Sequence, residues 1–91
     1  MAVSIRIPTP MRNLTGGAAE VSVEAATLSE AIKALDVAHP GVAERVLDES
    51  GALRRFVNVY VGDEDVRFLD GLQTELSDGT SISIIPAVAG G

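Results

Sequence analysis

The sequence predicts an α+β domain in which a mixed sheet of about five strands packs on one main helix. Apolar and polar residues alternate near both ends of the chain, as in half-buried strands. One segment in between has helical spacing and a capping signal. The resulting order is β-β-α-β-β-β, and such an order forms a two-layer domain with the helix on one face of the sheet.

The first two strands are expected to form a hairpin. Apolar residues alternate with polar ones over 3–7, and Pro8 and Pro10 end that strand. Alternation resumes over 20–24. Gly16-Gly17 supplies a turn, and residues 9–17 are expected to form a fairly long, mobile connection.

The main helix has a capping-box start, with Thr27 as N-cap and Glu30 three residues later. Pro40 disfavours helical geometry at the residue before it, so the helix is expected to end there. The spacing places four apolar residues on one face: Leu28, Ala31, Ile32 and Leu35. A further turn or two over 41–47 would place Val42, Val46 and Leu47 inward.

The second half of the chain completes the sheet. Residues 56–61 give the strongest strand pattern, with three valines on one face and Phe56, Asn58 and Tyr60 on the other. We expect a short strand over 66–68, a helical turn at Leu72 and Leu76, and a last strand over 82–85 that Pro86 closes. This is the β-grasp, or ubiquitin-like, topology, with residues 1–86 as the domain and 87–91 as a flexible tail.

Composition limits the function. The chain has 91 residues, 13 acidic against seven basic, and a net charge of −6, without the basic stripe that nucleic-acid binding needs. The acidic balance favours a basic protein partner. Without cysteine there is no disulfide, thiolate metal site or thiol nucleophile. No signal or membrane-spanning run is visible, and a cytoplasmic location is expected.

The C-terminal Gly90-Gly91 is the most informative pair of residues. Glycine has no Cβ, so the tail forms a thin stalk that can enter a narrow channel and present a terminal carboxylate to another enzyme. The ordinary alternative is a frayed chain end.

Four segments carry a resemblance to a known family. They are the tail 85–91 (IPAVAGG), the middle segment 55–67 (RFVNVYVGDEDVR), and the short stretches 7–9 and 15–17. Together they identify the chain as similar to the ThiS/MoaD-type ubiquitin-like sulfur carrier proteins. The middle segment resembles most closely the cysteine-forming carriers of actinobacteria.

The resemblance implies a covalent carrier that is a cosubstrate of enzymes and binds no cofactor itself. An E1-like adenylyltransferase/sulfurtransferase would adenylate Gly91 with ATP and convert it to a thiocarboxylate. Gly90, Ala89 and Val88 would form the tail that enters partner sites. A cysteine synthase that uses pyridoxal phosphate would accept the sulfur, and a metal-dependent peptidase would release the cysteine. The alternatives are the small subunit of molybdopterin synthase and a ubiquitin-like protein modifier.

Other residues bear on partner binding. Phe56, Tyr60 and Ile85 are expected on the face opposite the helix, either as a docking patch or simply covered by loops. Asp63 to Asp65 are expected to form a solvated turn, with electrostatic steering as the alternative.

The remaining candidates have ordinary structural explanations. Arg12 and Arg67 are expected in surface salt bridges, or paired with acids of a partner. His39 is alone and fits a loop, since no second histidine or cysteine can complete a metal site. We expect neither a metal site nor a catalytic constellation.

Overall fold

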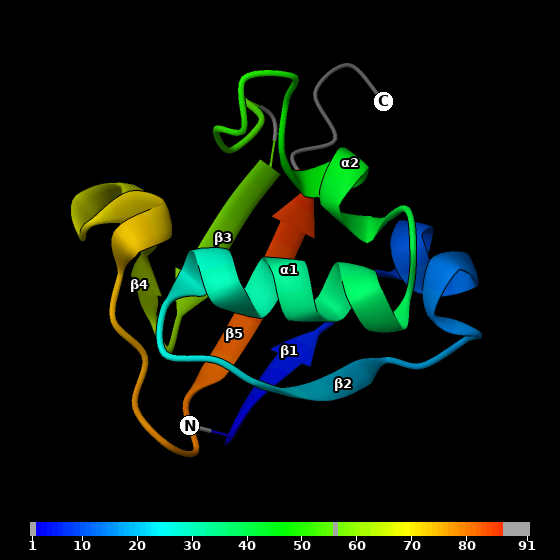
Figure 1. Cartoon of the computed structure of the whole chain (residues 1–91), viewed down its shortest axis with the longest axis horizontal. Helices are drawn as coiled ribbons and strands as arrows, with labels where there is room; N and C mark the ends of the chain where they lie inside the picture. The colour runs from blue at the N-terminus through cyan, green and yellow to red at the C-terminus, as the bar shows by residue number, and fades with distance from the viewer. Residues whose placement is uncertain (1, 56, 87–91) are drawn as a thin grey trace.

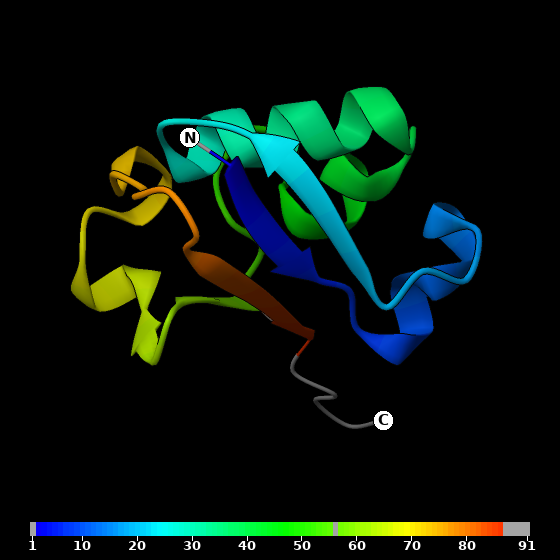
Figure 2. The same ribbon diagram turned by 90° about the horizontal axis from the view of Figure 1, so that it is seen from below.

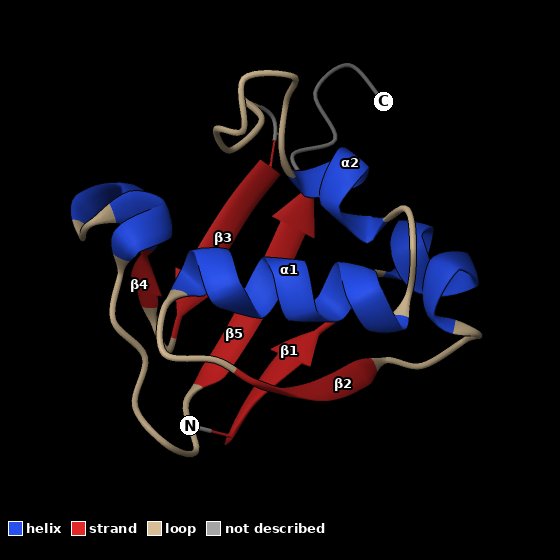
Figure 3. Ribbon diagram, viewed as in Figure 1, coloured by secondary structure: helices blue, strands red, loops and turns tan. Residues whose placement is uncertain are grey.

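The structure, a computed structural model, describes residues 2–55 and 57–86. Its strands and helices follow one another in a single domain (Figures 1 and 3). In chain order they are β1 (Ala2–Arg6), the 3-10 helix η1 (Thr9–Thr15), β2 (Glu20–Glu24), α1 (Leu28–Ala38), α2 (Val42–Val46), β3 (Val57–Val61), β4 (Glu64–Asp65), the 3-10 helices η2 (Val66–Phe68) and η3 (Gly71–Gln73), and β5 (Ser81–Pro86).

The five strands form one mixed sheet in the order β2-β1-β5-β3-β4 (Figure 3). The last strand of the chain is therefore central, parallel to β1 and antiparallel to β3. Arg6 at the end of β1 lies opposite Ser83, and Val57 at the start of β3 lies opposite Pro86. The chain thus leaves β5 at the end of the sheet where β1 ends and β3 begins.

Both α-helices lie on one side of the sheet (Figure 2). The apolar face of α1 is buried as its spacing predicted, with Leu28 and Leu35 wholly inaccessible to solvent. It packs over inward-facing strand residues, among them Ile5, Val59 and Ile82, which are each 1% exposed. The β-grasp arrangement expected from the sequence is confirmed.

Local signals explain where α1 begins and ends. The Thr27 hydroxyl oxygen accepts a hydrogen bond from the Glu30 amide at 3.3 Å. The Glu30 carboxylate accepts from the Ala26 amide at 2.9 Å, one residue earlier than in the standard capping box. The helix ends at Ala38, as Pro40 requires.

The region after β3 differs from the expectation. Residues 66–68 form the 3-10 helix η2, so the expected strand there is wrong, and the short strand is β4 just before it. The Asp65 carboxylate accepts from the Arg67 amide at 2.9 Å and starts the helical turn. Val66 is buried in a helical conformation, although its apolar character had suggested a strand. Of the two leucines expected in the next helical turn, η3 includes only Leu72.

The connection over 9–17 is also more regular than expected. Most of it is η1, which starts after Pro8 and buries Met11. The Thr15 hydroxyl lies 3.2 Å from the Arg12 carbonyl oxygen and 2.9 Å from that of Ala18. These side-chain contacts hold together a segment that its prolines and glycines had marked as a loop. The expected turn at Gly16-Gly17 is present, with φ of 65° and 90°.

Candidate functional site

The candidate site lies where β5 passes into the C-terminal tail. Val88, Ala89, Gly90 and Gly91, expected as tail and thiocarboxylate residues, lie outside the described residues, as does Phe56. The neighbouring end of the sheet is described. We call it the tail root, and define it as Arg6, Pro8, Arg12 and residues 83–86.

The strand register brings Tyr60 and Ile85 to the same face of the sheet. Ile85 lies opposite Asn58, and Tyr60 lies opposite Ser83, two residues further along each strand. Side chains at such diagonal positions are neighbours on one face. Ile85 is 47% exposed, whereas Ile84, on the helix-covered face, is 4% exposed. Tyr60 is half-buried. Two of the three expected docking residues therefore share the open face beside the tail root.

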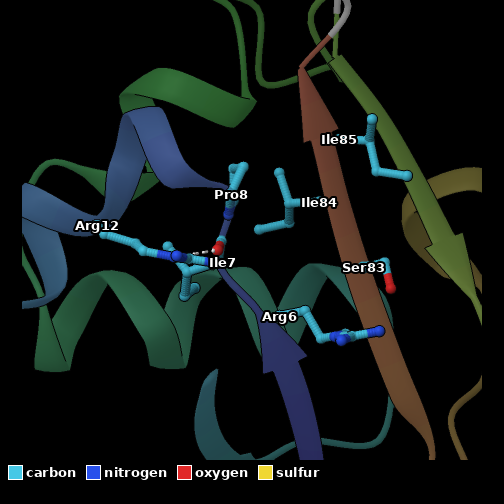
Figure 4. Close-up of a pocket in the computed structure, with 7 residues that line it drawn as sticks. All are labelled: Arg6, Ile7, Pro8, Arg12, Ser83, Ile84 and Ile85. Atoms are coloured by element: carbon cyan, nitrogen blue, oxygen red, sulfur yellow. Dashed lines mark hydrogen bonds between the residues drawn. The ribbon is translucent and has the colours of Figure 1, made fainter. Parts of the chain in front are cut away.

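A pocket of about 250 Å³ opens at the tail root. It forms because β1 pairs with β5 only as far as Arg6 and Ser83, whereas β5 continues along β3 to Pro86. Pro8 has no amide N–H to extend the ladder, and the chain turns there into η1. The walls, drawn in Figure 4, are Arg6, Ile7, Pro8, Arg12, Ser83, Ile84 and Ile85.

Two arginines are among the residues that line this pocket (Figure 4). The Arg12 Nε donates a hydrogen bond to the Ile7 carbonyl oxygen at 3.1 Å, which holds the half-buried side chain across η1. Arg6 is exposed and faces Glu20 across the β1–β2 ladder, but within residues 2–55 and 57–86 the two form no ion pair. Arg12 likewise has no acidic partner in that part of the chain. The salt bridge expected for it is therefore not found among the described residues.

Sequence reasoning singled out Arg12 but not Arg6. A signal was available, because Arg6 occupies a polar position of a strand that Pro8 ends two residues later. What the sequence did not reveal was that this position lies next to the last strand of the chain.

Among residues 2–55 and 57–86, Arg67 binds carbonyl oxygens and forms no surface salt bridge of the kind expected. Its guanidinium donates to the Asn58 Oδ1 at 2.6 Å and to the Val57 and Arg54 carbonyl oxygens at 2.8 and 3.0 Å. Asn58 is the cross-strand neighbour of Ile85. Arg67 therefore fastens the beginning of β3 beside the tail root.

The other candidates have local structural roles. Asp65 caps η2, while Asp63 and Glu64 are exposed in and after the turn that follows β3. His39 ends α1, with its amide donating to the Leu35 carbonyl oxygen at 2.8 Å. Across residues 2–55 and 57–86, no group of three or more metal-binding side chains comes together.

Asp48 organises the loop before β3. The Ser50 hydroxyl, together with the Ala52 and Ser50 amides, donates to its carboxylate at 2.6 to 3.1 Å. These donors, the Ser50 hydroxyl first, hold the pKa of Asp48 below its usual value.

None of the helices described is both long enough and apolar enough to cross a lipid bilayer.

Comparison with known proteins gives a consistent set of matches. The model of the ThiS family matches residues 5–91. The Sulfur carrier protein CysO of Mycobacterium tuberculosis is 50% identical over 93 aligned residues, with both chains covered completely. A chain in the crystal structure of the Amycolatopsis orientalis BexX/CysO complex superposes with a TM-score of 0.92 at 47% identity, covering 98% of this chain and 99% of that one. Small archaeal modifier protein 3 of Haloferax volcanii is 38% identical over 66 residues, 72% of this chain and 71% of its own.

Proposed function

The chain belongs to the ThiS family, and from this premise we propose that it is a sulfur carrier protein whose C-terminal Gly91 is converted to a thiocarboxylate. The observation that carries the proposal is the 50% identity with a protein named sulfur carrier protein CysO over the whole of both chains. The family match also reaches Gly91, the residue on which the chemistry would take place.

In the proposed reaction the terminal carboxylate is the group of this chain that reacts. On a partner enzyme, a Gly91 carboxylate oxygen attacks the α-phosphorus of ATP and pyrophosphate leaves. A sulfur donor of the hydrosulfide class then attacks the acyl carbon and AMP leaves, so that the thiocarboxylate remains. The protein is a cosubstrate whose C-terminus enters the active sites of partner enzymes. The ATP requirement is consistent with the cytoplasm as its compartment.

Docking in this proposal uses the open face beside the tail root. Ile85 offers an exposed apolar side chain at the base of the tail, and Tyr60 lies diagonally next to it. Partly exposed aromatic and aliphatic anchors of this kind are typical of protein interfaces. Phe56 is proposed to extend the patch, because it alternates with Asn58 and Tyr60 in the sequence. Gly90, Ala89 and Val88 would then pass into the active site of the partner.

For the sulfur acceptor we propose a cysteine synthase that uses pyridoxal phosphate. The thiocarboxylate sulfur would add to an acceptor made from an activated serine. The resulting thioester would rearrange to an amide, leaving a cysteine attached beyond Gly91. A metal-dependent peptidase would hydrolyse that peptide bond and restore the carrier. Pyridoxal phosphate and the metal belong to these partners, and the identity with CysO supports this branch over others.

The test is intact-mass measurement after incubation with an adenylating partner, ATP and a sulfide source. We expect the mass change of one oxygen replaced by sulfur, located at Gly91. Removal of Gly91, or extension by one bulky residue, should abolish the change, since misplacing a reacting atom by even about 1 Å can cost about 100-fold in rate. Absence of sulfur on the unaltered chain would contradict the carrier function.

A second stage separates the acceptor branches. With a cysteine synthase and an activated serine, the sulfurated chain should gain a cysteine at the Gly91 carbonyl. Transfer only to a molybdopterin precursor would instead identify the small subunit of molybdopterin synthase.

A second candidate function is protein modification. The similarity to small archaeal modifier protein 3 is the observation that favours this function. The distinguishing measurement is mass spectrometry of lysine side chains in a cell extract after sulfuration. Isopeptide bonds between Gly91 and lysine side chains would support a modifier. A single cysteine attached to the Gly91 carbonyl would support the carrier for cysteine synthesis.

A further inference from the structure

We infer that the pocket at the tail root is a binding site for an acidic side chain of the adenylating partner, attracted there by the two lining arginines, Arg6 and Arg12. The inference rests on the proposed function, because it concerns the partner that sulfurates Gly91. It goes beyond the apolar docking patch by assigning the charge of the group that the partner must present.

The chemistry of the pocket is that of a carboxylate site with apolar walls. Arg12 reaches into the lining from η1 toward Ile7, and Arg6 extends from β1 across β5 toward Ser83, so the two side chains line the pocket from different elements (Figure 4). The hydrogen bond from Arg12 Nε to the Ile7 carbonyl oxygen leaves its two terminal nitrogens for a ligand. Guanidinium forks match planar carboxylates, often with two parallel hydrogen bonds. Pro8, Ile84 and Ile85 would surround the aliphatic part of a glutamate or aspartate.

The placement of charge on the molecule supports an acidic occupant at this end. The chain carries a net charge of −6, which by itself favours a basic partner. Two acids lie at the other end of the sheet. Asp78 accepts from the Ala2 amide at the start of β1, and Glu24 lies opposite Ala2 in the register. At the tail root the two arginines outnumber Glu20, the acid opposite Arg6 in the ladder. A partner with an acid over the arginines would therefore be oriented by the difference in charge between the two ends of the sheet.

A nucleotide phosphate fits less well as the occupant. The acyl adenylate would form at Gly91, five residues beyond Pro86. Five extended residues span about 17 Å, so a tail stretched into the partner carries the phosphate well away from the pocket. An anion that binds next to Arg6 and Arg12 would therefore come from the partner surface around the base of the tail.

The experiment measures the Michaelis constant of the adenylating partner for the full-length carrier, with sulfuration followed by intact mass. The variants are Arg6→Glu, Arg12→Glu and the double change. Each single reversal should raise KM about tenfold with kcat retained, since charge complementarity acts mainly on encounter and binding. Arg12→Lys, which keeps the charge but loses the fork, should fall in between. Raising sodium chloride should increase KM for the unaltered chain more steeply than for the double variant.

Lys33→Glu is the matched control. It makes the same charge reversal at an exposed position of α1, an element that contributes no residue to the pocket, and should leave KM unchanged. Thermal unfolding of every variant checks the fold, and Arg6→Glu keeps the test sound if Arg12→Glu disturbs η1. Equal KM values for the double variant and the unaltered chain would overturn the acidic-group site. A loss confined to kcat would overturn it as well. Failure of the unaltered chain to accept sulfur would instead refute the carrier function itself.

Discussion

At the scale of single residues, Ile84 and Ile85 show how one strand serves both the core and the candidate site. They are consecutive in β5, yet one is 4% exposed and the other 47% exposed. Successive side chains of a strand point to opposite faces, so Ile84 packs under the helix layer and Ile85 faces outward. An exposed isoleucine contributes little to folding and is available to a partner.

This contrast predicts different costs for the same substitution. Ile84→Ala and Leu35→Ala should each reduce the free energy of unfolding by about 2–5 kcal/mol, through lost burial and the cavity left behind. Ile85→Ala should cost less than about 1 kcal/mol. Urea unfolding of the three variants measures the difference. If Ile85→Ala destabilises as much as Ile84→Ala, the assignment of the two faces is wrong.

At the scale of secondary-structure elements, the predictable segments are those whose signals are local. The apolar spacing and Thr27 cap define α1, and the valine alternation defines β3. The prediction for the segment after β3 was wrong because a strand and a 3-10 helix follow each other there within five residues, 64–68. Strand β4 spans two residues, and the Asp65 cap turns the chain into η2 immediately afterwards. An aspartate at an N-cap position was the available signal.

The contacts of Arg67 predict a role in holding the start of β3. Arg67→Ala removes hydrogen bonds to the Val57 and Arg54 carbonyl oxygens and to Asn58. Because this group is largely exposed, we expect a modest loss of about 1–2 kcal/mol, concentrated in local opening. Hydrogen exchange should speed up about tenfold at Val57 and Asn58 and stay unchanged in α1. Arg45→Ala, at an exposed position of α2, is the control and should change neither. Unchanged exchange at Val57 in Arg67→Ala would show that the guanidinium does not hold this segment.

The loop at Asp48 predicts a defined pH dependence. Donors from Ser50 and Ala52 favour the ionised carboxylate, so the folded pKa of Asp48 lies below its ordinary value. The contribution of the carboxylate is complete above the pKa of an unfolded aspartate, about 3.9, and disappears as pH falls through the lower folded value. The amide signals of Ser50 and Ala52 should therefore titrate below about pH 3.9, and Ser50→Ala should move the midpoint upward. A midpoint at or above the ordinary value would contradict these hydrogen bonds.

At the scale of the whole molecule, β5 joins the two halves of the chain. It pairs with β1 from the beginning of the sequence and with β3 from the middle. Sequence patterns predicted these three strands but not the proximity of Arg6 to Ser83, because parallel pairing between distant segments leaves no local mark. The proposed docking residues Tyr60 and Ile85 could be placed by alternation alone, whereas the arginine pocket required the three-dimensional register.

The central position of β5 predicts how far the chain can be shortened. A chain of residues 1–86 should keep the melting temperature of the full chain to within about 2 °C, because every core residue described lies at or before Ile84. A chain ending at Thr80 should not fold, since it lacks the strand that fills the middle of the sheet and buries Ile82 and Ile84. Circular dichroism and thermal unfolding measure both. The 1–86 chain should also compete with the full-length carrier for the adenylating partner, because it retains the tail root, while accepting no sulfur itself. If it folds but does not compete, recognition resides in the tail, and neither the Ile85 face nor the arginine pocket is the docking surface.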